Sequence, residues 1–172
     1  MAKRSSKDLR IVLLGEEHDR NSFTCGVESL DRYLKTQAGQ DVRRKAIAVF
    51  VLSEVGKPTH VLGYYTLCAL SISQGDVPET ARKHVPRYPL VSATLIGRLA
   101  IAKDRQGQRL GAVLLADALQ RAFDSASTVG SSMVVVDALD EGAAGFYAAH
   151  GFVRLPDTLR LVLPMRLAGR SE

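Results

Sequence analysis

The apolar positions of this chain follow two periods, which together predict a mixture of strands and helices. Continuous or alternating apolar runs predict strands at residues 9–14, 46–55, 61–71, 131–138, 152–155 and 159–165. Apolar residues three or four positions apart predict helices at residues 25–34 and 141–150, the second ended by Gly151. Residues 90 to about 126 are expected to form a strand, a turn and a long helix.

Two polar stretches separate these elements. Residues 41–45 are expected to be a charged connector, and residues 75–89 carry three prolines around a short helix at 79–84, inside a mobile loop. The Gly56-Lys57-Pro58 turn predicts an antiparallel hairpin between the strands on either side of it. The full order is β-α-β-β-loop-β-α-β-α-β-β, which predicts an α/β fold with a mixed central sheet and helices on both faces.

Composition bounds the class of protein. The chain has 172 residues, 46% of them hydrophobic, with no repeat or linker, so one domain over residues 1–172 is expected. Its net charge of +5 favours phosphate-bearing partners. Cys25 and Cys68 lack metal-ligand spacing and are expected to be reduced thiols, with no metal site. No apolar run is long enough for a signal peptide or a membrane span, so a cytoplasmic protein is expected.

The segment from Arg98 to Ala122 joins an apolar strand to an amphipathic helix through a basic turn. A helix start offers unpaired backbone N–H groups and the positive end of the helix dipole, which suit a pyrophosphate. The expected cradle is Gln106, Gly107, Gln108, Arg109, Leu110 and Gly111, with Ala112 following. The positions expected to face the core behind it are Leu114, Leu115, Ala118, Leu119 and Ala122. An ordinary strand–helix connection is the alternative.

This turn resembles the acetyl-CoA pyrophosphate loop of the GCN5-related N-acetyltransferase (GNAT) family: Gln or Arg, two residues, Gly, one residue, Gly or Ala. Gln106 and Gly111 match, and Arg109 occupies the place of the first glycine. Arg109 is expected to keep a right-handed backbone, and a positive φ at this place would make the assignment wrong. The resemblance implies the GNAT fold, with a mostly antiparallel sheet, and acetyl-CoA as cosubstrate. It also implies that backbone groups of Leu99, Ala100 and Ile101 bind the pantetheine arm.

A second tract, AAGFYAAHGF at residues 143–152, resembles the motif that closes the core of the same family. The resemblance implies that the Tyr147 hydroxyl lies near the cofactor sulfur and protonates the departing thiolate. A phenol with a pKa near ~10 is a suitable donor to a thiolate near ~8.5. The alternative is that Phe146 and Tyr147 only pack the helix against the sheet. His150 is expected to have a local capping role.

A carboxylate is absent where many family members carry a general base. The stretch 94–101 holds none, while Asp137, Asp140 and Glu141 follow the next strand, where a carboxylate could reach a substrate. Capping of the following helix is the simpler role for Asp140. Without a base, the substrate amine should already be largely neutral. The amine of an aminoacyl ester meets this need, because the ester lowers its pKa.

Four tracts in order resemble a narrower group, the tRNA-acetylating toxins of bacterial toxin–antitoxin pairs. They begin at Phe23, Gly63, Arg98 and Gly145 and read FTCGVESLDRYL, GYYTL, RLAI and GFYAAHGF. The resemblance implies acetyl transfer from acetyl-CoA to the α-amine of an aminoacyl-tRNA, which blocks translation. It also implies a homodimer and neutralisation by a small ribbon-helix-helix antitoxin.

Basic residues are the candidates for tRNA contact. They are Arg43, Arg44 and Lys45, then Arg82, Lys83 and Arg87, the N-terminal Lys3, Arg4 and Lys7, and Arg98. A solvated surface is the alternative for each cluster. Arg98 interrupts an apolar strand, so it could pair with a buried carboxylate or face the acceptor end. With few aromatic residues expected at the surface, recognition would rest on shape and phosphates.

Two other functions stay open at this stage. The chain could acetylate a small-molecule or protein amine, or it could be a catalytically silent module that binds acetyl-CoA or nucleic acid. An intact Tyr147 argues against the silent module. The sequence leaves open which aminoacyl-tRNA or amine is acetylated.

Overall fold

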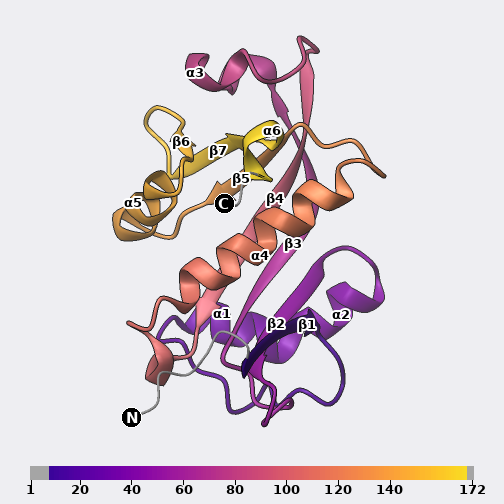
Figure 1. The fold of residues 1–172 in the computed structure, drawn as a ribbon, viewed down its shortest axis with the longest axis vertical. Helices are drawn as coiled ribbons and strands as arrows, with labels where there is room; N and C mark the ends of the chain where they lie inside the picture. Colours follow the sequence, from indigo (N-terminus) through magenta and orange to yellow (C-terminus); the bar gives the residue numbers. More distant parts are fainter. Residues whose placement is uncertain (1–7, 170–172) are drawn as a thin grey trace. The chain divides into compact units, whose positions relative to one another are not determined.

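The computed structural model describes residues 8–169, and its helices and strands are labelled in Figure 1. The strands are β1 (Leu9–Leu13), β2 (Ala48–Glu54), β3 (Gly63–Ser73), β4 (Leu90–Ile101), β5 (Met133–Asp137), β6 (Val153–Arg154) and β7 (Arg160–Pro164). The α-helices are α1 (Glu28–Arg32), α2 (Ala38–Arg43), α3 (Glu79–Arg82), α4 (Leu110–Ser125), α5 (Glu141–Ala149) and α6 (Met165–Ala168). A π-helical turn is η2 (Tyr33–Gln37), and two 3₁₀-helices are η3 (Gln74–Asp76) and η4 (Lys103–Arg105).

The strands form one mixed sheet in the order β1-β2-β3-β4-β5-β7-β6. The pairs β1–β2, β5–β7 and β6–β7 are antiparallel, whereas β4 and β5 are parallel, with Ala93 opposite Met133 and Ile96 opposite Val136. Residues Met133 to Val136 are fully buried, as expected for a central strand covered on both faces. The mixed α/β fold and the order of its elements are therefore confirmed.

The described chain divides into two compact units. The first contains residues 8–66 and 98–117, and the second contains residues 67–97 and 118–169. Their cores form separate apolar clusters: the first gathers around Leu34, Val49 and Tyr64, and the second around Met133 and Val162. The expectation of one domain over the whole chain stays a prediction.

The predicted helix at residues 25–34 is displaced in the structure. Gly26 has φ +90°, and the Cys25 amide donates to the Asp31 carboxylate at 2.8 Å, so the chain is still non-helical at these residues. The helix begins at Glu28 and continues through the π-helical turn η2 into α2. The expectation of a connector at 41–45 was therefore wrong in part, because α2 ends only at Arg43. A hydrogen bond of 2.9 Å from the Tyr33 hydroxyl to Asp41 holds this longer helix together.

The proline-rich segment of the second unit is better anchored than a mobile loop would be. Its short helix is confirmed as α3, and the side chains of Val77, Ala81 and Val85 are buried in the core cluster of that unit. The Gln74 amide donates to the Pro89 carbonyl at 3.0 Å, which closes the segment at its base.

None of the helices within residues 8–169 is long and apolar enough to span a bilayer. Both cysteines are free thiols, as expected.

Candidate functional site

The turn before α4 is braced by the side chain of Gln106. Its amide Nε2 donates to the carbonyl of Ile101 at 3.1 Å and to the carbonyl of Cys25 at 2.8 Å. The first bond ties the turn to the end of β4, and the second ties it to a segment 81 residues earlier in the chain. Gln106 therefore has a positioning role in the expected cradle, which its place in the motif did not reveal.

Two residues of the turn adopt left-handed backbone conformations. Gly107 has φ +82°, and Arg109 has φ +61°. The expectation of a right-handed backbone at Arg109 was wrong, and the condition under which the assignment of Arg109 to the motif fails is met. The physical reason is that the place of the family's first glycine keeps the conformation that glycine adopts without strain. In this chain an arginine adopts it, at a cost of about 1–2 kcal/mol.

The start of α4 presents a set of backbone donors. The first four N–H groups of a helix lack intrahelical partners, and the first turn of α4 holds no acidic side chain that would compete with an anion. Residues 106–109 are exposed, Leu110 is buried, and Gly111 and Ala112 are half-buried. The helix face behind them is buried at Leu114, Leu115, Ala118 and Ala122, as expected, and half-buried at Leu119.

The expected pantetheine strand is the end of β4. The parallel register with β5 pairs Ala93 to Ile96, so Leu99, Ala100 and Ile101 lie beyond its last pair. Ala100 is buried, whereas Leu99 and Ile101 are half-buried. A Cβ at Gly63 of β3 would lie 2.8 Å from the Ala100 carbonyl oxygen, so only glycine fits opposite this part of β4.

Arg98 makes a contact that was not expected. Its guanidinium carbon lies 3.5 Å from the centre of the Tyr33 ring, a cation–π contact. Tyr33 is in turn stacked on Tyr64, with ring centroids 6.5 Å apart. Arg98 is half-buried, and its charge lies against the ring of the buried Tyr33 in place of the expected carboxylate partner. No local signal shows this contact, since Arg98 and Tyr33 are distant in sequence.

Tyr147 lies in α5 and is 7% exposed. Its ring packs edge-on against Phe146 and Phe152, at centroid distances of 5.2 and 5.6 Å. Burial raises the pKa of Tyr147 to about 12, so the phenol stays protonated at neutral pH. Within residues 8–169 its hydroxyl makes no hydrogen bond. The surroundings of Tyr147 are thus compatible with both expectations. The packed ring fits a role in holding the helix, and the protonated hydroxyl fits a role as proton donor.

His150 closes α5. Its Nδ1 lies 2.8 Å from the Phe146 carbonyl oxygen, and its backbone N–H donates to the Tyr147 carbonyl at 2.9 Å. Gly151 follows with φ +96°. The expected capping role is confirmed, and so is the glycine that ends the helix.

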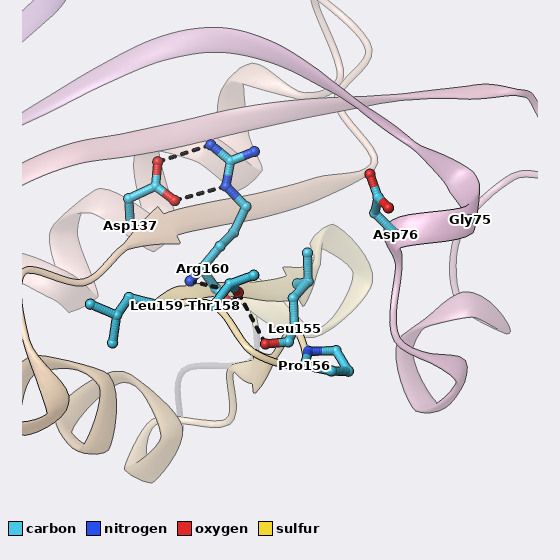
Figure 2. A pocket seen from close by; sticks show the side chains of 8 residues that line it. All are labelled: Gly75, Asp76, Asp137, Leu155, Pro156, Thr158, Leu159 and Arg160. Carbon is cyan, nitrogen blue, oxygen red and sulfur yellow. Dashed lines mark hydrogen bonds and ion pairs between the residues drawn. The ribbon is translucent and has the colours of Figure 1, made fainter.

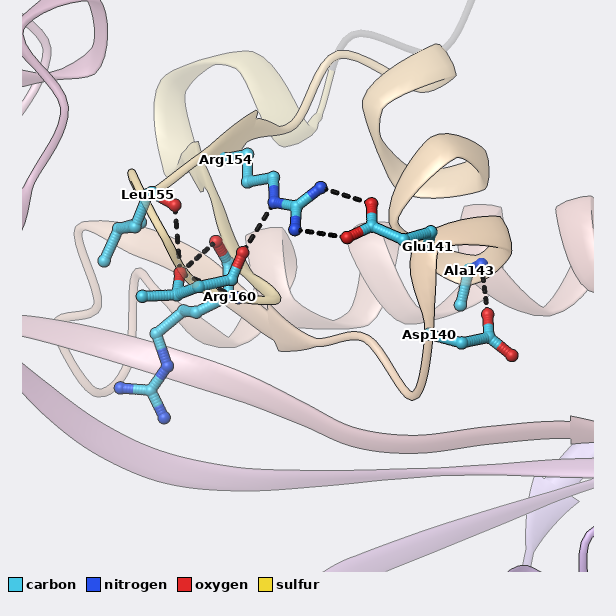
Figure 3. Close-up of polar contacts among 7 residues, drawn as sticks. Asp140, Glu141, Ala143, Arg154, Leu155 and Arg160 are labelled. Atoms are coloured by element: carbon cyan, nitrogen blue, oxygen red, sulfur yellow. Dashed lines mark hydrogen bonds and ion pairs between the residues drawn. The ribbon is translucent and has the colours of Figure 1, made fainter.

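The three carboxylates at the end of β5 and just after it all have hydrogen-bond partners. The Asp140 carboxylate accepts from the Ala143 amide at 2.8 Å, which confirms the predicted N-cap of α5 (Figure 3). Glu141 forms two hydrogen bonds with the Arg154 guanidinium, at 2.6 and 2.9 Å, and this pairing lowers the pKa of Glu141 below its usual value. Asp137 is paired in the same two-pronged way with Arg160, at 2.7 and 2.9 Å. Each of the three therefore already has a hydrogen-bond partner within its own unit.

A cavity of about 590 Å³ lies beside the Asp137–Arg160 pair (Figure 2). It is lined by Gly75, Asp76, Asp137, Leu155, Pro156, Thr158, Leu159 and Arg160. Figure 2 shows the Arg160 side chain bonded to Asp137, with Asp76 on the opposite wall. Arg160 and Asp76 were not singled out from the sequence, because this grouping brings together three segments that are distant along the chain.

The basic clusters differ in how their side chains are used. Arg43, Arg44 and Lys45 are exposed at the end of α2. In the second cluster the Arg82 guanidinium donates to the carbonyls of Val77 and Gly75, so this charge stabilises its own loop. Lys83 and Arg87 are exposed. The N-terminal candidates Lys3, Arg4 and Lys7 lie outside the described residues. Among residues 8–169, no group of histidine, cysteine and acidic side chains could hold a metal ion.

Comparisons with known proteins identify the family of this chain. The acetyltransferase (GNAT) family model matches residues 83–152. The tRNA-acetylating toxin of Mycobacterium tuberculosis is 33% identical over 154 residues, which cover 89% of this chain and 90% of that toxin. The chain is also similar to the structure of AtaT complexed with acetyl-methionyl-tRNAfMet, with a TM-score of 0.84 and 32% identity over 92% of this chain and 96% of that one. A tyrosine-to-phenylalanine mutant of the AtaT toxin, bound to the C-terminus of the antitoxin AtaR and acetyl-CoA, has a TM-score of 0.79 and 30% identity over 94% and 96% of the two chains.

Proposed function

Because this chain belongs to the GNAT family of acetyl-CoA-dependent N-acetyltransferases, within the group of tRNA-acetylating toxins, we propose that it acetylates the α-amine of an aminoacyl-tRNA. The observation that carries the proposal is the similarity over nearly the whole chain to the Mycobacterium tuberculosis toxin. The structure of AtaT complexed with acetyl-methionyl-tRNAfMet supports the same substrate class. Acetylation would block the amine that forms the next peptide bond, and the protein would act in the cytoplasm, where translation takes place.

The start of α4 fits the phosphates of acetyl-CoA. A Cβ built on Gly107 would meet no atom within 4 Å, so the turn is open on that side. Unpaired N–H groups at the helix start would donate to the pyrophosphate, and the helix dipole favours its negative charge. The proposal keeps Gln106 to Ala112 as the binding segment, because the contacts would be made by peptide N–H groups, which the left-handed backbone of Arg109 also presents. Gln106 would brace the turn. Leu99 and Ile101 would bind the pantetheine arm through their backbone.

Acetyl-CoA supplies an activated acetyl thioester. Tyr147 would give its phenolic proton to the thiolate that leaves when the substrate amine takes the acetyl group, and the proton that the nitrogen loses on forming the amide would return to the phenolate. Its raised pKa keeps this proton in place between turnovers. A thiolate in the same low-dielectric surroundings would also have a raised pKa, so the two groups stay comparable as donor and acceptor.

The engaged carboxylates favour an amine that needs no base. Asp137 and Glu141 are paired with arginines, and Asp140 caps α5. An ordinary alkyl amine is protonated at neutral pH and would have to lose a proton to the protein first. The α-amine of an aminoacyl ester is already largely neutral, which supports the tRNA proposal over acetylation of a lysine side chain or of another simple amine.

The experiment that tests the substrate is incubation of the purified chain with labelled acetyl-CoA and either aminoacylated or uncharged tRNA. We expect label only on the aminoacylated tRNA, with release as an N-acetyl amino acid after mild alkaline hydrolysis of the ester. Label found only on a free amine or on protein would contradict aminoacyl-tRNA as the substrate, although the chain would still be an acetyltransferase.

The proposed partners are an antitoxin and a second copy of the chain. The AtaT mutant was solved with the C-terminus of its antitoxin AtaR, which supports an antitoxin for this chain as well. The ribbon-helix-helix class of that antitoxin and the homodimer follow from the family resemblance. Sedimentation of the purified chain, with and without the product of a neighbouring short reading frame, tests both.

A further inference from the structure

Tyr88 is an aromatic side chain held in solvent. Its exposed fraction is 67%, the highest of the large hydrophobic side chains apart from Val129 at 73%. No other ring within residues 8–169 packs against it. Because burying an aromatic ring is strongly favourable, a tyrosine left this exposed is available to stack on a flat partner.

The backbone around Tyr88 is constrained. Pro86 and Pro89 flank the Arg87-Tyr88 pair, and a residue before proline is restricted to extended conformations. The hydrogen bond from the Gln74 amide to the Pro89 carbonyl closes the segment directly beside the tyrosine. Buried Val85 anchors the other side. Little conformational entropy remains for this backbone to lose on binding, so the ring is preorganised for a partner.

The surroundings of the ring are basic. Lys83 and Arg87 are both exposed, and neither is paired with an acidic side chain among residues 8–169. The guanidinium of Arg82 adds positive charge from its position against the carbonyls of Val77 and Gly75. An exposed ring next to unpaired cations matches an unpaired nucleotide, whose base presents a flat face and whose phosphates are anionic.

We propose that Tyr88 stacks on an unpaired base of the tRNA while Lys83 and Arg87 bind the adjoining phosphates. This inference rests on the proposed function and names one contact for its substrate. The bases of an A-form stem are stacked inside the helix and cannot reach such a ring, so the contact requires a single-stranded region. Every aminoacyl-tRNA ends in one. A second copy of this chain is a poorer occupant, because a two-fold interface would set this basic patch against itself.

The test measures binding of a short single-stranded RNA that carries the fluorescent base 2-aminopurine, whose emission falls when it stacks. We expect quenching with the parent chain and about tenfold weaker binding, without quenching, for Tyr88→Ala. Tyr88→Phe should keep both, because the ring face is unchanged. Arg87→Gln should weaken binding and lower the slope of log K against log salt by about one. Val129→Ala, a change at another exposed apolar position, is the matched control.

Equal affinity and equal quenching for Tyr88→Ala and the parent would overturn the proposal. So would a change in sedimentation on Tyr88→Ala, because the ring would then belong to a protein interface. The oligonucleotide readout is independent of catalysis. Failure of the parent to acetylate aminoacyl-tRNA therefore counts against the proposed function. The stacking contact is tested separately, by comparing the quenching of 2-aminopurine by the parent with that by Tyr88→Ala.

Discussion

At the scale of single residues, Arg109 has a backbone conformation that its residue type disfavours, as do Lys45 and Asp157. Its φ of +61° belongs to the left-handed region, which the Cβ of an L-residue makes unfavourable. The side chain is exposed, so packing does not compensate for the strain.

We expect Arg109→Gly to raise the free energy of unfolding by about 0.5–1 kcal/mol, because glycine relieves the strain but adds backbone entropy to the unfolded chain. Urea denaturation measures the change. Arg32→Gly in α1, where the backbone is right-handed, should lower stability by about 1 kcal/mol and serves as the control. A loss of stability at Arg109 would contradict the assigned strain. Acetyl-CoA titration of the same variant shows whether the arginine side chain also binds phosphate.

Tyr147→Phe separates the two roles considered for that tyrosine. The ring contacts with Phe146 and Phe152 would remain, and the hydroxyl has no hydrogen-bond partner in residues 8–169 to leave unsatisfied. We expect the rate of acetyl transfer to fall about 10²–10⁴-fold, since a proton donor is lost. Acetyl-CoA affinity, measured by calorimetry, and the unfolding midpoint should stay close to those of the parent. An unchanged rate would leave the residue with packing alone.

At the scale of elements, two side-chain contacts decide how the helices of each unit are placed. In the first unit, Arg98 of β4 contacts Tyr33 of the π-helical turn η2, whose hydroxyl reaches Asp41 of α2. In the second unit, Asp140 sets the start of α5, the helix that carries Tyr147. The contact of Arg98 fixes η2 against β4, whose end is proposed to bind the pantetheine arm. The cap at Asp140 fixes the start of the helix that carries the proposed proton donor.

We expect Asp140→Ala to lower the free energy of unfolding by about 1 kcal/mol, because the Ala143 N–H loses its capping acceptor. Thermal or urea unfolding measures the loss. Glu28→Ala removes a carboxylate whose only described ion pair is an exposed contact of 3.4 Å with Arg32, and should change stability by less than about 0.5 kcal/mol. Asp140→Asn should keep most of the cap, so an equal loss in Asn and Ala variants would argue against capping.

At the scale of the whole molecule, the burial of uncharged tyrosine and cysteine side chains makes the stability of the fold depend on pH in the alkaline range. Burial raises the pKa of Tyr147 to about 12 and that of Cys25 to about 11, and it also raises the pKa of Tyr64. The folded chain therefore holds these protons more tightly than the unfolded chain does. Their stabilising effect is complete below the unfolded values, near ~8.5 for cysteine and ~10 for tyrosine, and is lost as pH rises through the folded values.

We expect the free energy of unfolding of the parent chain to fall progressively above about pH 9, as these groups ionise first in the unfolded state. Urea titrations at a series of pH values between 8 and about 11 measure the slope. Tyr147→Phe should lose less stability over the upper part of this range, because one of the linked groups is gone. A parallel pH dependence of the two chains would show that Tyr147 is not protected by burial in the folded state.

The sequence by itself determined the order of the elements, the mixed sheet, the helix that follows the turn at residues 106–109 and the caps at Asp140 and Gly151. These features depend on residues close together in the chain, whose periodicity and capping chemistry act locally. Only the tertiary structure decided the left-handed backbone of Arg109, the contact of Arg98 with Tyr33 and the engagement of Asp137 by Arg160. It also decided that Tyr88 stays exposed while Tyr147 is buried, although both are tyrosines in partly apolar tracts. Partners and burial depend on which distant segments pack together, and no local pattern carries that information.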